Sequence, residues 1–267
     1  MERLVEMKNV SIRTNGRVRL DDVSFMVNQG EHRALLGLNG SGKTTLLQAI
    51  LGQVWATEGE VHTWFGRHGR VNMQDLRREI GIVSNALDDQ YQHRAGETAF
   101  NVALSGYFAS IGIYEQAPEE ITARAENALH TFGVSQYRDV PYAALSQGEK
   151  RRVMLARAWT TGAKLLLLDE PCTGLDVKGR EELIEGLEAS LQSPDSPTVL
   201  YVTHHLEELP GAVEAATIMK NGRVQADGKK QEVLTDQEIS TAFDVNGSIQ
   251  WHEQRPWFIT GGATIRR

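Results

Sequence analysis

Short runs of alternating hydrophobic and polar residues dominate the first ninety positions of the chain, and this period of two is typical of β-strands. Asn15-Gly16 and Gln29-Gly30 supply the residues that turns between strands favour. A helix over residues 43–51 is also predicted within this region, and Gly52 marks its end. The runs that predict strands are residues 5–12, 19–27, 32–38, 60–66 and 79–83.

The pattern changes between residues 85 and 145, where β-branched runs are few and helices are indicated. Pro118 and the two glutamates after it predict the start of a helix over residues 121–132, because proline and acidic side chains suit a first turn. The longest uncharged stretch, residues 98–114, is predicted to form a buried amphipathic helix. It falls short of the roughly 20 apolar residues that a membrane-spanning helix needs.

Strands and helices alternate after residue 146, and this order predicts a parallel sheet covered by helices. A hairpin is then expected to turn at Asn221-Gly222, between residues 216–219 and 223–226. We therefore predict a doubly wound α/β fold with residues 229–267 as a C-terminal appendage, packed by Trp251, Trp257 and Phe258. The alternating elements are a basic helix over 147–160, a strand over 164–169, a helix over 179–191 and a strand over 198–203.

Composition places the chain among ordinary globular proteins and removes several classes of function. It has 267 residues, of which 40% are hydrophobic and 24% charged, so disorder is excluded. A single cysteine, Cys172, cannot form a disulfide framework and indicates a reducing compartment. The acidic residues at the start do not fit a secretory signal, so we expect a cytoplasmic protein. A net charge of −7 argues against nucleic acid as the main partner.

A glycine-rich loop stands between a predicted strand and a predicted helix. It reads Gly-Leu-Asn-Gly-Ser-Gly-Lys-Thr-Thr, which is the phosphate-loop pattern in its strand-to-helix setting. The glycines let backbone N–H groups converge on phosphate oxygens, and the helix N-terminus adds positive potential. Lys43 would hold the β- and γ-phosphates of a nucleotide, and the Thr44 hydroxyl would bind Mg²⁺. The predicted nucleotide-binding residues are Gly37, Leu38, Asn39, Gly40, Ser41, Gly42, Lys43, Thr44 and Thr45.

Two carboxylates end the apolar run Leu165-Leu166-Leu167-Leu168. Open α/β sheets bind ligands at the carboxyl ends of their strands, so Asp169 fits the role of holding Mg²⁺ and Glu170 that of polarising the attacking water. His204 ends the next predicted strand and is a weaker candidate, because a second histidine follows it. Zinc is not expected, because the chain lacks paired Cys and His spacings.

The chain resembles the ABC-type ATPases at residues 145–152, which read Leu-Ser-Gln-Gly-Glu-Lys-Arg-Arg. That family joins such a signature to an earlier phosphate loop and to a later strand that ends in carboxylates. Gly174-Leu175-Asp176 is similar to the family's D-loop, and Thr203-His204 to its switch histidine. The three basic residues after Glu149 are expected to form a solvated face of the signature helix.

The resemblance covers residues 1–228 and implies one ATPase domain with the P-loop NTPase fold. In this arrangement a RecA-like core and an antiparallel β subdomain occupy residues 1–84 and 146–228. A helical subdomain is inserted at residues 85–145.

The resemblance also implies a head-to-tail homodimer that binds two ATP molecules with Mg²⁺ at its interface. Binding of ATP would close the dimer and hydrolysis would release it. The implied catalytic residues are Glu170, His204 and Lys43. Ser146 and Gly148 of the other subunit would complete each ATP site, beside the D-loop residue Asp176.

Three positions depart from the family's pattern. No aromatic residue stands near Thr14 to stack on adenine, although the planar guanidinium of Arg13 could cover the ring. Gln147 and Glu149 replace a commoner glycine and glutamine of the signature. Asn85 replaces the usual glutamine after strand 79–83.

Asn85 keeps the carboxamide of the usual glutamine but is one methylene shorter. It joins Thr44 and Asp169 as a predicted metal ligand, and Gln90 or Gln92 could substitute for it.

The family's commonest use is as the motor of a membrane transporter, and this is the function that we favour. The chain has the helical lobe that docks on membrane helices but no predicted span. We therefore expect a separate membrane subunit, with the ATPase peripheral on the inner face of the cell membrane and without a stable nucleic-acid partner. One nucleotide domain per chain is typical of importers, and the sequence around Gly30 and Gly81 is similar to the molybdate and iron-chelate branch.

Two alternatives stay open at this point. A soluble ABC ATPase of translation or DNA repair usually carries a second phosphate loop or a long coiled coil, and neither is visible. A small-molecule kinase would explain the phosphate loop but not the signature.

Overall fold

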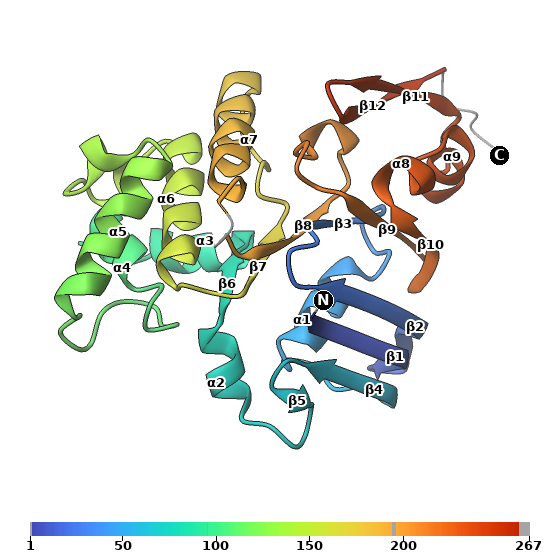
Figure 1. The fold of residues 1–267 in the computed structure, drawn as a ribbon, viewed down its shortest axis with the longest axis horizontal. Coiled ribbons are helices and arrows are strands. Elements are labelled where there is room, and N and C mark those ends of the chain that lie inside the picture. The colour runs from blue at the N-terminus through green and yellow to red at the C-terminus, as the bar shows by residue number, and fades with distance from the viewer. Residues whose placement is uncertain (1, 95, 194–195, 262–267) are drawn as a thin grey trace. The chain divides into compact units, whose positions relative to one another are not determined.

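The computed structural model describes residues 2–94, 96–193 and 196–261 (Figure 1). It forms two compact units, of which the first comprises Met1–Met73 with Thr198–Arg267 and the second Gln74–Pro197. The second unit is thus inserted into the sequence of the first.

An antiparallel sheet in the first unit comes from the alternating pattern near the N-terminus. Its strand order is β2-β1-β4-β5, and each pairing is antiparallel. Asn15 and Gly16 both have positive φ values, 51° and 73°, which a tight two-residue hairpin turn requires. The strands are β1 (Arg3–Thr14), β2 (Arg17–Asn28), β4 (Glu58–Thr63) and β5 (Gly66–Arg67).

Parallel strands form the second sheet of the same unit. Strand β3 (Arg33–Leu36) pairs in parallel with β8 (Thr198–Thr203) on one side and β9 (Ala215–Lys220) on the other. All residues of β3 and β8 are buried, as expected for strands in the middle of a parallel sheet. Strand β10 (Arg223–Lys229) completes the predicted hairpin with β9, and α1 (Lys43–Ile50) follows β3.

The predicted appendage, residues 229–267, falls within the first unit, and its described part contains two helices and a two-stranded sheet. Phe258 packs against Phe243 with ring centroids 6.4 Å apart, so this aromatic residue stabilises the appendage as predicted. Trp251 and Trp257 remain 39% and 38% exposed, so the prediction that they pack the appendage is only partly correct. The elements are α8 (Lys230–Val233), α9 (Asp236–Phe243), β11 (Gly247–His252) and β12 (Arg255–Thr260).

The second unit combines the parallel pair β6 (Ile80–Val83) and β7 (Leu165–Asp169) with a group of helices. Helices α4 and α5 both pack on α6 (Figure 1). Leu104, Ile121 and Ala125 form an apolar cluster of this lobe, and Phe100 and Ile113 pack against it. The helices are α2 (Met73–Arg78), α3 (Asn85–Gln92), α4 (Ala99–Leu104), α5 (Glu119–Thr131), α6 (Gln147–Thr160) and α7 (Val177–Leu191).

The prediction of one buried helix over residues 98–114 is wrong for its second half. Helix α4 ends at Leu104, and the chain then passes through turns in which Ala109 and Gly112 have positive φ values, 49° and 90°. Glycines and serines in this stretch supply few helix-stabilising contacts, so the apolar pattern alone does not continue the helix. Helix α2 is short and was not predicted, whereas α3 lies in the stretch 85–145 where helices were indicated without individual bounds.

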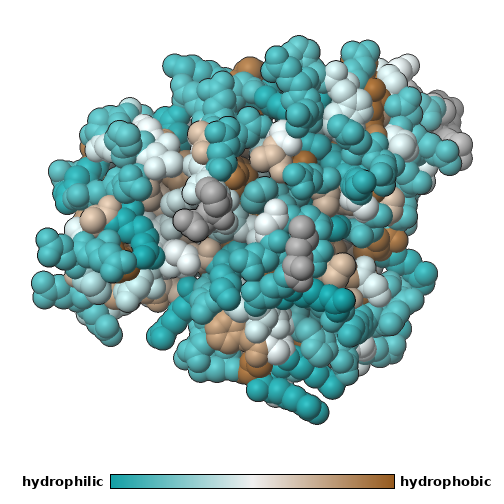
Figure 2. Space-filling view, viewed as in Figure 1, coloured by the Kyte–Doolittle hydropathy of each residue, from teal (hydrophilic) through white to brown (hydrophobic). Residues whose placement is uncertain are grey.

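Within the described residues, none of the helices has the length and apolar character to span a membrane. Hydrophilic side chains cover most of the face in Figure 2, and hydrophobic ones form small, separate areas. The surface on this side therefore resembles that of ordinary globular proteins.

Close packing at the end of α4 gives a test of this lobe. A Cβ added to Gly106 would lie 2.0 Å from the backbone oxygen of Arg157 on α6. We expect Gly106→Ala to lower the free energy of unfolding by about 2 kcal/mol, because neither backbone can move away cheaply. Urea denaturation measures this change.

Gly186→Ala is the control for this substitution. Its added Cβ would meet Phe132 Cδ1 at an ordinary 3.7 Å in the interior of α7. Alanine should there stabilise the helix by up to about 1 kcal/mol. Equal effects of the two substitutions would contradict the close contact between α4 and α6.

Candidate functional site

The loop between β3 and α1 is shaped by glycines with backbone conformations that other residues avoid. Gly37 has φ +148° and Gly42, the N-cap of α1, has φ +110°. A Cβ on Gly37 would lie 2.4 Å from Met219 O and 2.6 Å from Ser41 Oγ. The loop thus closes on itself as only glycine permits, while residues 38–40 are exposed along its outer side.

Lys43 and Thr44 begin the helix that follows this loop. Lys43 is buried, and its Nζ donates to the carbonyl oxygens of Gly37, at 2.7 Å, and Leu38, at 3.2 Å. The side chain of Thr44 is exposed. No acidic residue stands in the first turn of α1, so nothing there offsets the positive end of the helix dipole.

Ser41 shows that the loop fits an anionic ligand. Its side-chain oxygen is buried without a hydrogen-bond partner, whereas its backbone oxygen accepts from Gly222 N at 2.9 Å. The first N–H groups of α1 also have no carbonyl four residues earlier within the helix. These donors are the groups that bind phosphate oxygens at helix N-termini.

His204 lies at the same sheet edge as the loop, because β3 and β8 run in parallel. Leu36 pairs with Thr203, so both strands end together, next to Gly37 and His204. The ring of His204 contacts that of His205 at a tilt of 41°, with centroids 4.1 Å apart. The first unit thus brings together the predicted phosphate loop and the predicted switch histidine.

A buried carboxylate anchors the turn after β8. Thr203 Oγ1 donates to Glu208 Oε2 at 2.7 Å and accepts from His205 N at 3.0 Å. Burial raises the pKa of Glu208 above its usual range. No periodic pattern in the sequence points to this residue, since the short helix that carries it spans only Leu206–Glu208.

Asp169 and Glu170 end β7 in the second unit. Glu170 has a left-handed backbone, φ +50°, which is uncommon for a residue with a side chain. Thr173 N donates to Glu170 O at 3.2 Å, and Thr173 Oγ1 donates to Glu170 Oε2 at 3.4 Å. A tight turn thereby holds the carboxylate just past the strand end.

Asn85 begins helix α3 directly after β6. The parallel pairing of Val83 with Leu168 places it at the sheet edge where Asp169 ends its strand. The side-chain oxygen of Asn85 accepts a hydrogen bond from Arg151 of α6.

The expectation that residues 150–152 form a solvated face is wrong, since even Arg152 is only 17% exposed and pairs with Glu182. Lys150 and Arg151 are buried because this side of α6 faces other parts of its own unit. Lys150 Nζ lies 6.0 Å from the ring centroid of Tyr142.

A capping box starts the signature helix α6. Ser146 Oγ accepts from Glu149 N at 3.4 Å, and Glu149 Oε2 accepts from Ser146 N at 2.7 Å. A hydrogen bond from Tyr137 lowers the pKa of Glu149. Glu149 therefore supports the helix start as an ionised carboxylate.

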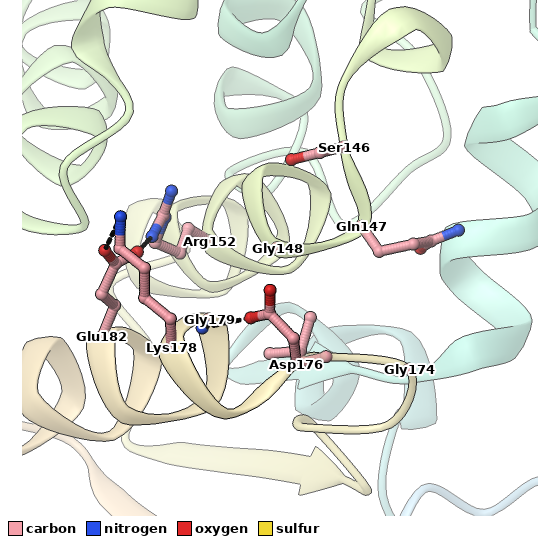
Figure 3. A pocket seen from close by; sticks show the side chains of 10 residues that line it. Ser146, Gln147, Gly148, Arg152, Gly174, Asp176, Lys178, Gly179 and Glu182 are labelled. Atoms are coloured by element: carbon pink, nitrogen blue, oxygen red, sulfur yellow. Dashed lines mark hydrogen bonds and ion pairs between the residues drawn. The ribbon is translucent and has the colours of Figure 1, made fainter.

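The start of α6 and the start of α7 line one cavity of about 330 Å³ (Figure 3). Ser146 and Gly148 border it from the signature, and Asp176 borders it from the predicted D-loop. Asp176 caps α7 by accepting from Gly179 N at 2.7 Å. Spacing predicted these residues individually, whereas the shared cavity emerges only from the packing.

An ion-paired group closes the far side of the same cavity. Glu182 on α7 accepts from Arg152 and lies 3.6 Å from Lys178 Nζ. Figure 3 shows these three side chains next to one another.

Comparisons with known proteins give the family. The ABC transporter model matches residues 20–173. The uncharacterized ABC transporter ATP-binding protein YlmA of Bacillus subtilis (strain 168) is 39% identical over 98% of each chain. The cobalt import ATP-binding protein CbiO of Rhodobacter capsulatus is 38% identical over 81% of this chain and 75% of its own length.

A solved structure agrees with these relatives. The ATP-binding cassette MJ0796, in a dimeric post-hydrolysis state bound to ADP and Pi, has a TM-score of 0.70 at 28% identity, covering 85% of this chain and 98% of its own. The chain therefore belongs to the ABC transporter family of ATP-binding proteins, as the sequence resemblance predicted. Its mixed α/β fold is that of the ABC ATPase cassettes.

Burial of Glu208 predicts a pH-dependent contribution to stability. Its pKa in the folded protein lies above the ordinary value of 4.5. Between these two pKa values, the folded protein keeps a proton on Glu208 that the unfolded chain has released. This contribution is present below pH 4.5 and is lost as pH rises through the folded pKa. Glu208→Gln cannot titrate and should gain stability relative to the parent protein as pH rises from 4 through the folded pKa of Glu208.

Urea denaturation at several pH values measures this difference. Glu232→Gln, which removes an exposed carboxylate from the same unit, controls for the change in net charge. A pH-independent difference between Glu208→Gln and the parent protein would contradict the raised pKa.

Proposed function

We propose that this protein is the ATP-hydrolysing motor subunit of a membrane transporter and that it works as a homodimer. The observation that carries the proposal is the pair of helix starts. One is α1 behind a glycine loop closed around Lys43, and the other is α6 with Ser146 and Gly148 at the rim of a cavity. Two such anion-binding helix N-termini could bind the triphosphate of a nucleoside triphosphate from opposite sides.

The phosphate loop binds ATP in this proposal. Backbone N–H groups of residues 37–45 face the phosphates, and Lys43 exchanges its carbonyl partners for the β- and γ-phosphate oxygens. Catalysis of phosphoryl transfer depends mainly on such positioning and charge stabilisation.

Mg²⁺ would be held by Thr44 and Asp169, with Asn85 as the third candidate ligand. Hydroxyl, carboxylate and amide oxygens are suitable donors, and Mg²⁺ usually combines few protein ligands with phosphates and water. Over the part of the chain that the structure describes, no group of three His, Cys, Asp or Glu side chains could hold a metal. In this proposal the ion arrives with the nucleotide. When bound, it neutralises charge on the phosphates.

Hydrolysis needs a group that orients the attacking water. Glu170 takes this role, because a carboxylate at a strand end can accept a proton from water. His204 lies at the phosphate-loop edge of the first unit and would contact the γ-phosphate.

The dimer would complete each site with the signature of the second subunit. Ser146 supplies a hydroxyl, Gly148 lets the backbone approach closely, and the α6 N-terminus supplies its dipole. Asp176 would lie at the subunit interface. ATP then favours the closed dimer because both subunits contact it only in that state.

A separate membrane-spanning subunit would transmit this closure to the transported solute. The family assignment supports this partner, and the relative that is named for cobalt import supports the direction of transport. The protein would then be peripheral on the inner face of the cell membrane.

Glu170→Gln tests the proposed hydrolysis step. The variant should bind ATP as the parent protein does, lose turnover by at least about 100-fold, and accumulate as an ATP-bound dimer. Phosphate release and size-exclusion chromatography with ATP measure the two effects. Normal phosphate release would exclude Glu170 as the water-polarising residue.

Lys43→Ala tests the proposed phosphate contact. Loss of a charge-assisted hydrogen bond should weaken ATP binding by about 10-fold to 100-fold, as measured by calorimetry. Lys229→Ala removes an exposed lysine of the same unit and should leave the affinity unchanged. Equal affinities for all three proteins would refute the role of Lys43.

A further inference from the structure

A buried cation of the signature helix lies against the residue that replaces the family's usual glutamine. Arg151 is only 3% exposed, and one arm of its guanidinium donates to Asn85 Oδ1. Its Nη1 lies 4.0 Å from Asp88 Oδ2, one turn further along α3. A buried charge is costly unless such partners compensate it.

Asp88 continues the network to a third element. It is buried, and its Oδ1 accepts from the hydroxyl of Tyr142 at 2.6 Å. Tyr142 is fully buried in the short helix Tyr142–Ala144, shortly before the signature. Arg151, Asn85, Asp88 and Tyr142 thus connect α6, α3 and the segment that leads into the signature.

The chemistry of these groups fixes the orientation of the Asn85 carboxamide. A guanidinium has donors only, so the oxygen of Asn85 must face Arg151, and this hydrogen bond uses one of the two lone pairs of that oxygen. Nε and Nη1 of Arg151 are buried without hydrogen-bond partners. Asn85 is therefore the principal acceptor for this cation, and its loss leaves the charge with Asp88 alone at 4.0 Å.

We propose that Arg151 is a positioning residue that fixes the Asn85 side chain to the signature helix. Asn85 lies at the sheet edge beside Asp169, and Arg151 lies five positions after Ser146. A displacement of the signature helix would thereby change the orientation of the Asn85 carboxamide. This carboxamide lies at the sheet edge that carries Asp169, the proposed metal ligand, and Glu170, which is proposed to orient the attacking water. This inference rests on the proposed ATPase function, because it assigns a role to Asn85 within that site.

Double-mutant cycles test this link. Asn85→Ala and Arg151→Met should each lower kcat by about fivefold to tenfold and raise the Mg²⁺ concentration for half-maximal activity. The double variant should be no slower than the slower single variant, because both substitutions remove one interaction. The KM for ATP should change less than kcat.

Arg157→Met is the matched control. Arg157 is also buried on α6, at 6% exposure, but its partners are the hydroxyl of Tyr91, at 3.3 Å, and the backbone oxygen of Ser110, at 3.1 Å. The double variant Arg157→Met with Asn85→Ala should therefore lower kcat by the product of the two single effects. Multiplicative effects of Arg151→Met and Asn85→Ala, like those of the control pair, would overturn the proposal.

Conservative variants keep the test decisive where Arg151→Met fails to fold. Asn85→Asp retains an acceptor and should keep more activity than Asn85→Ala when Arg151 is present. In an Arg151→Lys background, with a shorter and less branched donor, this advantage should shrink. An unchanged advantage would count against the link.

Unfolding free energies of the same single and double variants, measured by urea denaturation, test the Arg151–Asn85 contact independently of the proposed ATPase function. A parent protein without ATPase activity would contradict the proposed function, whereas non-additive unfolding of Asn85→Ala and Arg151→Met would still support the contact. Additive unfolding in an active enzyme would contradict the contact while leaving the proposed function intact.

Discussion

Parallel pairing of buried strands is the interaction on which the candidate site depends. In the first unit it makes β3 and β8 end together, so the glycine loop and His204 lie at one edge. In the second unit it makes β6 and β7 end together, which places Asn85 beside the carboxylates. Each strand contributes only four to six residues, yet hydrophobic burial on both faces fixes its register.

Helices α1 and α6 differ in whether a side chain caps the backbone N–H groups of their first turn. Helix α1 begins at Gly42 without a side-chain cap, whereas α6 begins with the reciprocal bonds of Ser146 and Glu149. Glu149 is ionised and lies at a helix end that the proposed function assigns to a phosphate. Repulsion between two anions would then oppose ATP at this point, and positive groups nearby, including Arg152, would reduce that cost.

The phosphate loop and the carboxylate strand were predictable because each depends on residues that are adjacent in sequence, and the family was predictable because these motifs follow one another in the family's order. Strong periodicity also located most strands and the long helices, with errors of a few residues at their ends. The loop after Leu104 was not predictable, since its turns at Ala109 and Gly112 reflect tertiary packing. The domain limits and the roles of individual site residues remain predictions.

Contacts between distant residues explain the other differences. Arg151 belongs to a basic run that would ordinarily be solvated, and only the approach of α3 buries it. No spacing rule connects position 85 with position 151. The cavity shared by Ser146 and Asp176 likewise depends on how two helices pack within their unit.

The left-handed backbone of Glu170 sets stability against the catalytic role proposed for this residue. Glycine adopts this conformation without strain, so Glu170→Gly would relieve about 1 kcal/mol of backbone strain while removing the carboxylate. If Glu170 orients the attacking water as proposed, selection for thermal stability alone would favour an inactive protein at this position. The glutamate carries a local backbone strain that other interactions in the fold must offset.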